Sequence, residues 1–119
     1  MATVKRELPE QKRAIPRRLL LALAGAALVA APASAAPKVY VVTLQQMVFG
    51  PVPTGLRVGD IIEWVNNDIF VHSATAKDKS FDVELKPKAR VRMVLKKAGR
   101  IAFYCRYHPG MTGTLVVAK

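Results

Sequence analysis

One cysteine among 119 residues excludes any disulfide bond within the chain. Long apolar runs are scarce as well, and the run from Leu19 to Ala31 is shorter than the roughly 20 residues that a membrane span needs. After Ala36 the sequence shows no helical period of apolar residues, no internal repeat and no low-complexity stretch. These absences exclude a disulfide-stapled scaffold and argue against a helical or repeat architecture.

The chain opens with a basic segment, an apolar run and a group of small residues. Residues 1–18 are polar and basic, and Ala33-Ser34-Ala35 follows the apolar run. This order is typical of a secretory signal peptide. Arg17-Arg18 directly before the run is compatible with twin-arginine export. We therefore predict a signal peptide over 1–35, a mature domain over 36–119 and a periplasmic location. After cleavage no stable membrane insertion is expected, and the alternative is that the segment is retained as an anchor.

Short runs rich in β-branched and aromatic residues follow one another through the mature part. Turn residues such as Gly59, Pro87 and Gly99 separate these runs. Several short strands at regular spacing indicate an antiparallel sandwich or barrel, so the predicted fold class is all-β. The predicted strands cover residues 38–44, 60–65, 70–76, 81–85, 89–95, 100–105 and 112–117.

Strand alternation places two reactive side chains on apolar faces. Cys105 shares a face with Ile101 and Phe103, and His72 shares one with Phe70. Both faces are predicted to point inward, where a buried polar group needs a partner. The aromatic residues that we expect in the core are Trp64, Phe70, Phe81 and Phe103.

A C-x-x-H-x-x-M motif lies near the end of the chain. Its residues are Cys105, His108 and Met111, and the remaining histidine is His72. Two imidazoles, a thiolate and a weak thioether form the ligand set of a blue copper electron-transfer site. Thiolate and thioether suit Cu(I) and imidazole suits Cu(II), so a mixed site can change oxidation state with little rearrangement. We predict one copper ion bound by these four residues.

Three other functions could use the same side chains. A copper carrier or storage protein would share the ligands but exchange its metal, and the mixed set argues against it. A Cys–His enzyme would use Cys105 as nucleophile, but no Gly-rich oxyanion loop or third orienting group is apparent. Zinc could occupy a His2Cys site, but thioether is a poor zinc ligand. We therefore expect an electron carrier and not an enzyme.

With these residues the chain resembles the cupredoxins, most closely the amicyanin, plastocyanin and pseudoazurin group. Amicyanin and its relatives have the same short Cys-x2-His-x2-Met spacing, whereas plastocyanin and pseudoazurin have longer loops before the Met. The similarity covers nearly all of 36–119 and includes residues 57–60 and 64–66. It implies a Greek-key β-sandwich with copper at one end. The implied close ligands are His72, Cys105 and His108, with Met111 axial.

The resemblance also indicates how the site is supported and reached. The electron would leave through the edge of the His108 ring, surrounded by apolar residues. Relatives commonly have Asn directly after the first histidine, where its side chain ties this strand to the cysteine loop. Ser73 stands at that position, so a shorter side chain would have to make the tie. The apolar residues expected around His108 are Pro51, Pro53, Pro109 and Gly110.

Positive charge is in excess in the mature part. Residues 36–119 carry 13 Lys and Arg against 6 Asp and Glu, a formal net charge of +7. An exported protein does not meet nucleic acid, so this excess favours steering toward an acidic redox protein, such as a c-type cytochrome or a periplasmic oxidoreductase. Arg106 lies beside His108 and is expected to strengthen the positive field there. The protein itself is expected to be a monomer.

Overall fold

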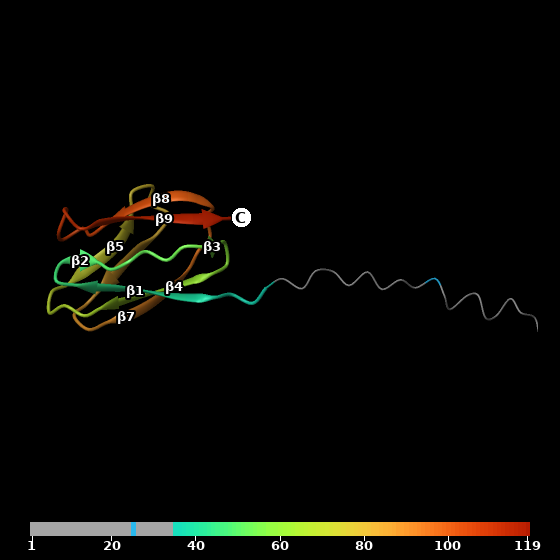
Figure 1. Cartoon of the computed structure of the whole chain (residues 1–119). Helices are drawn as coiled ribbons and strands as arrows, with labels where there is room; N and C mark the ends of the chain where they lie inside the picture. Colours follow the sequence, from blue (N-terminus) through green and yellow to red (C-terminus); the bar gives the residue numbers. More distant parts are fainter. Residues whose placement is uncertain (1–24, 26–34) are drawn as a thin grey trace, which may run out of the picture. The chain divides into compact units, whose positions relative to one another are not determined.

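Two facing β-sheets make up the part of the chain that the computed structural model describes, residues 35–119 together with Gly25 (Figure 1). One sheet has the strand order β2-β1-β4-β7, and the other has the order β3-β9-β8-β5-β6. The predicted all-β sandwich is confirmed. The strands are β1 (Val39–Gln45), β2 (Val48–Phe49), β3 (Leu56–Arg57), β4 (Ile61–Asn66), β5 (His72–Ala76), β6 (Asp82–Leu85), β7 (Arg90–Val94), β8 (Gly99–Tyr104) and β9 (Thr112–Ala118).

Residues 35–119 form one compact unit. The predicted signal peptide over 1–35, its paired arginines and the alternative of a retained anchor lie outside the described residues, apart from Gly25 and Ala35. In the described part of the chain, no helix has the length and hydrophobicity that crossing a membrane requires.

Alternating side chains build the core between the sheets. Val42 and Leu44 of β1 are fully buried, whereas Val41, which points to the opposite face, is exposed. Trp64 of β4 and Phe103 of β8 meet edge to face, with their ring centroids 5.3 Å apart. This aromatic contact between the sheets fixes β8, the strand that leads into the C-x-x-H-x-x-M motif.

The structure differs from the sequence prediction in four respects. The expected antiparallel pairing is not complete, because β1 pairs with β4 and β3 pairs with β9 in parallel. Strands β2 and β3 have two residues each and are too short for alternation to reveal. The predicted position of Phe70 in the core is wrong, because β5 begins at His72 and Phe70 is 51% exposed in the preceding loop. Cys105 directly follows β8 rather than ending it, but it is fully buried as predicted.

The pairing between β5 and β8 stops before it reaches His72. The two strands pair at Thr75↔Tyr104 and at Ala76↔Phe103. The β8–β9 loop and the β1–β2 turn lie at the same end of the sandwich, opposite the C-terminus (Figure 1). At this end, the first residues of β5 pair with β6 on one side and face the β8–β9 loop on the other.

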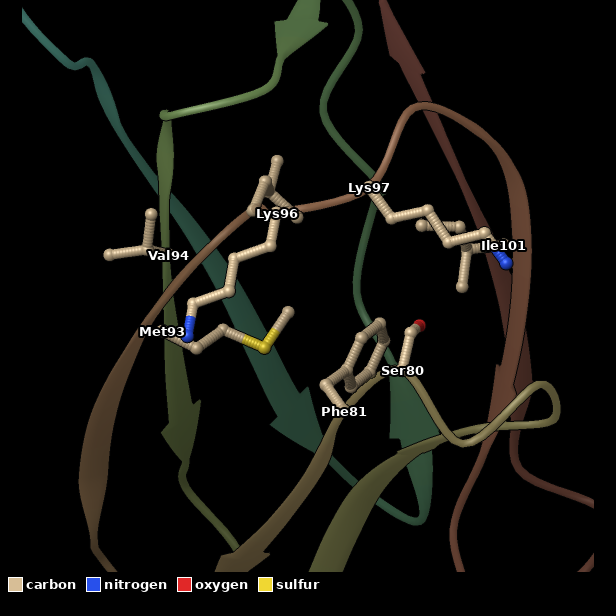
Figure 2. A pocket seen from close by; sticks show the side chains of 8 residues that line it. Ser80, Phe81, Met93, Val94, Lys96, Lys97 and Ile101 are labelled. Carbon is tan, nitrogen blue, oxygen red and sulfur yellow. The ribbon is translucent and has the colours of Figure 1, made fainter.

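A small cleft opens between the edges of the two sheets at the other end (Figure 2). Phe81, Met93 and Ile101 line it, and the side chains of Lys96 and Lys97 run alongside. Its volume of about 30 Å³ holds about two water molecules. Small-molecule sites occupy about 300–1,000 Å³, so this cleft is not a candidate substrate site.

Candidate metal centre

Three side chains direct one donor atom each toward a common point at the β8–β9 loop end. The Nδ1 atoms of His72 and His108 are 3.1 Å apart, and Sγ of Cys105 lies 3.7 Å from the first and 3.6 Å from the second. A point equidistant from these atoms lies about 2 Å from each, close to the bond lengths of imidazole and thiolate to a first-row metal ion. The donor set therefore fits a single metal ion. His72 joins the motif in space, as the sequence predicted.

Backbone hydrogen bonds fold the C-x-x-H-x-x-M motif into a compact loop. The amide of Cys105 donates a hydrogen bond to the carbonyl of Met111 at 3.0 Å, and the amide of Met111 donates to the carbonyl of His108 at 2.9 Å. These bonds close a tight turn through Pro109 and Gly110. As a result, Met111 is buried in the same core cluster as Cys105, and His108 stays partly exposed.

A carboxylate fixes the orientation of His72. Nε2 of His72 lies 2.7 Å from Oδ2 of Asp68. An ionised carboxylate only accepts, so Nε2 carries the hydrogen, and in the neutral imidazole Nδ1 turns its lone pair toward Cys105 and His108. Burial alone would raise the pKa of Asp68, but hydrogen bonds from the Met47 amide, His72 and the Gln46 amide outweigh burial and lower it. Nothing in the sequence signals this role, since Asn66-Asn67-Asp68 is typical of a turn.

Ser73 makes the tie between β5 and the cysteine loop. Its Oγ accepts the Arg106 amide at 2.8 Å, and its own amide lies 3.4 Å from Sγ of Cys105. Thr75 donates its one hydroxyl hydrogen to Asp82, so Ser73 must donate to Thr75 at 2.9 Å. Nε of Arg106 closes the ring on Asp82 at 3.0 Å. A ring of four residues therefore takes the place of a single longer side chain.

The side chains of Arg106 and Tyr107 extend from the loop across β5 to β6. Arg106 pairs with Asp82, and the Tyr107 hydroxyl donates to Glu84. The hydrogen bond to Glu84 raises the pKa of Tyr107 above its usual value. Because the two side chains extend over this strand, all five residues of β5 are buried on both faces of the sheet. The positive charge of Arg106, which was expected to strengthen the field around His108, is thus paired with the carboxylate of Asp82.

Apolar side chains lie beside the exposed edge of His108. The Phe70 ring centroid is 6.3 Å from that of His108 in an edge-to-face arrangement, and the neighbouring Ile69 is 75% exposed. Pro51, Pro109 and Gly110 are exposed as well, whereas Pro53 is partly buried and lines a hollow with Thr114 and Val116 of β9. Sequence reasoning missed Ile69 and placed Phe70 in the core. The signal available was a pair of apolar residues directly after a polar turn.

Comparisons with known proteins bear on both the fold and the site. A family profile described as a cupredoxin-like domain matches residues 18–117. Two amicyanin variants in the Cu(I) form superimpose with TM-scores of 0.59 and 0.58 at 21% and 22% identity, over 66% and 72% of this chain and 81% and 86% of theirs. The copper-containing nitrite reductase of Thermus scotoductus SA-01 superimposes with a TM-score of 0.59 at 27% identity, over 70% of this chain but only 22% of its own. No curated protein sequence matches.

These likenesses agree with the geometry. The amicyanin structures share the fold of this chain, and the family match extends over most of its length. The cluster of His72, Cys105, His108 and Met111 is typical of a type 1 copper site. The chain belongs to the cupredoxin-like family.

Proposed function

We propose that this protein is a periplasmic electron carrier that binds one copper ion through His72, Cys105 and His108, with Met111 as a weak fourth ligand. The observation that carries the proposal is the triangle of two imidazole nitrogens and one sulfur, with sides of 3.1, 3.7 and 3.6 Å. When bound, copper supplies the one-electron chemistry by alternating between Cu(I) and Cu(II). The periplasmic location rests on the signal-like segment over 1–35.

The residues around the site hold the donor atoms in place. Asp68 fixes the tautomer of His72, and the amide of Ser73 points at the sulfur of Cys105. His72 and Cys105 are fully buried, so water does not reach their donor atoms. His108 is the one partly exposed member of the triangle, and its ring edge is the proposed path for the electron to the surface.

Visible absorption tests the proposal directly. The Cu(II)-loaded protein is expected to be intensely blue, because the Cys105 thiolate would be a close ligand, and ascorbate should bleach it. Cys105→Ser should lose at least about nine-tenths of this absorption. Met93→Leu is the matched control, because Met93 packs against the core away from the cluster and should leave the spectrum unchanged. A copper-loaded wild-type protein without colour, or a blue Cys105→Ser variant, would falsify the assignment.

We further propose that the partner is a redox protein with an acidic docking surface, such as a c-type cytochrome or a periplasmic oxidoreductase. Arg106 is paired with Asp82, so the positive field at the copper end rests on the exposed Lys86 and Lys88 of the β6–β7 loop. This loop adjoins the β4–β5 loop, since Nζ of Lys88 donates to the carbonyl of Asn67 at 2.6 Å. Charges near a contact surface act mainly on the association rate.

Electron transfer to an acidic acceptor is therefore expected to slow as salt is added, since screening shortens to about 10 Å at 0.1 M. Lys86→Glu should lower the second-order rate several-fold at low salt, as measured by stopped-flow absorbance with an acidic c-type cytochrome. Lys96→Glu makes the same charge change at the opposite end and should have a much smaller effect. If the second-order rate does not change with salt and is equal in both variants, the apolar surface around His108 is the sole contact with the partner.

A further inference from the structure

The turn between β1 and β2 has an unfavourable backbone conformation for its sequence. Gln46 and Met47 form a two-residue connection, with φ angles of 52° and 63°. Positive φ at both positions is the pattern of a type I′ turn, which favours Asn-Gly or Asp-Gly. A left-handed conformation is unfavourable for a residue that has a Cβ atom, because that atom crowds the following carbonyl oxygen. Neither residue here is glycine or asparagine, so the turn needs support from elsewhere.

Asp68 supplies this support from the β4–β5 loop. Its Oδ1 accepts the Gln46 amide at 2.7 Å, and its Oδ2 accepts the Met47 amide at 3.0 Å. Hydrogen bonds to a charged acceptor are stronger than neutral ones. The Asp68 amide in turn donates to the side chain of Asn66, which is fully buried at the end of β4. The carboxylate is therefore held by the loop and holds the turn.

The same carboxylate contacts the metal centre. Oδ2 of Asp68, which accepts the Met47 amide, also lies 2.7 Å from Nε2 of the fully buried His72. A buried donor without an acceptor loses its hydrogen bonds to water and gains none in return, so His72 strongly favours the ring orientation that keeps this bond. That orientation is the one that brings Nδ1 within 3.7 Å of Sγ of Cys105.

From these contacts we propose that Asp68 is a positioning residue that locks His72 for metal binding and couples its orientation to the β1–β2 turn. The inference rests on the proposed copper site. Removing a group that hydrogen-bonds the second ring nitrogen of a metal-binding histidine typically weakens metal binding about 10–100-fold. Coupling between two sites is reciprocal, so metal binding must also stabilise the turn.

The test compares Asp68→Asn with Asp78→Asn. Asp78 is a close match, because it accepts an amide from Ser80, pairs with Lys97 and lies next to Lys79, whose φ is 65°. Asp68→Asn should weaken copper binding 10–100-fold, whereas Asp78→Asn should stay within about twofold. Copper should slow hydrogen exchange at the amides of Gln46 and Met47 in the wild-type protein and lose this effect in Asp68→Asn.

A variant with favourable residues in the β1–β2 turn distinguishes the role of Asp68 in positioning His72 from its role in stabilising the fold. Gln46→Asn with Met47→Gly should restore the melting temperature of Asp68→Asn, because the turn no longer needs the carboxylate. It should not restore copper affinity if Asp68 positions His72. Full recovery of affinity in this triple variant, or unchanged affinity in Asp68→Asn itself, would overturn the proposal.

One readout does not depend on copper. Imidazole nitrogen shifts of the metal-free protein should show His72 with its hydrogen on Nε2 in the wild type and a changed tautomer population in Asp68→Asn. If the wild-type protein binds no copper, the proposed function fails while this measurement still tests the hold of Asp68 on His72. An unchanged tautomer population would exclude that hold whatever the metal.

Discussion

Copper loading is expected to raise the melting temperature of the domain by roughly 15–30 °C. A ligand that binds only the folded state adds about 4 kcal/mol when its free concentration is 1,000-fold above Kd. For a domain of this size, each kcal/mol shifts the melting temperature by about 4–8 °C. The site also joins the first residue of β5 to the β8–β9 loop, at the end where the pairing of β5 with β8 has stopped.

Scanning calorimetry of metal-free and copper-loaded protein would measure this difference. Cys105→Ser should narrow the gap, because it removes one corner of the donor triangle without changing the size of the side chain much. Copper shown to be bound but with no change in melting temperature would contradict a site that bridges His72 and the cysteine loop.

Gly113→Ala is expected to destabilise the fold by roughly 2–3 kcal/mol, toward the upper end of the usual cost of overpacking. A Cβ atom at this position would lie 2.3 Å from Cζ of Phe103, the residue opposite it on β8. The Phe103 ring has no exposed surface and meets Phe49 at 4.8 Å and Trp64 at 5.3 Å between centroids. It therefore has little room to move aside.

Urea unfolding of the metal-free protein isolates this effect from metal binding. Gly110→Ala is the matched control, because a Cβ atom there would meet nothing within 4 Å, and its stability should change by less than about 0.5 kcal/mol. Phe103→Leu combined with Gly113→Ala should cost less than the sum of the two single changes, since the smaller side chain makes room. Equal stability of Gly113→Ala and wild type would show that the ring can shift.

The strands and the ligand motif could be predicted because both are local patterns. Alternation of apolar residues predicted that Cys105 and His72 point inward, and both are fully buried, although Cys105 lies one residue beyond β8. The C-x-x-H-x-x-M motif closes on itself through backbone hydrogen bonds. Phe70 broke the pattern because the chain between β4 and β5 turns at Asp68, and β5 starts two residues after Phe70. Alternation alone cannot say where a strand begins.

The supports of the site could not be predicted, because they depend on how distant strands align. Thr75 meets Asp82 because these residues are paired in the register of β5 with β6, and Arg106 reaches the same carboxylate from the loop after β8. Asp68 meets Gln46 and Met47 only once β1 and β4 run side by side in parallel. Nothing in the sequence near these residues indicates such contacts.

The burial of β5 on both faces has a consequence for the speed of the proposed electron transfer. Arg106 and Tyr107 extend over its outer face, so the polar groups next to the Cys105 sulfur are hydrogen-bonded protein dipoles rather than mobile water. Dipoles that are already fixed need not reorient when the charge at a site changes. The reorganisation energy contributed by this side of the centre is therefore small, and a carrier of this design loses little time to rearrangement as each electron arrives or leaves.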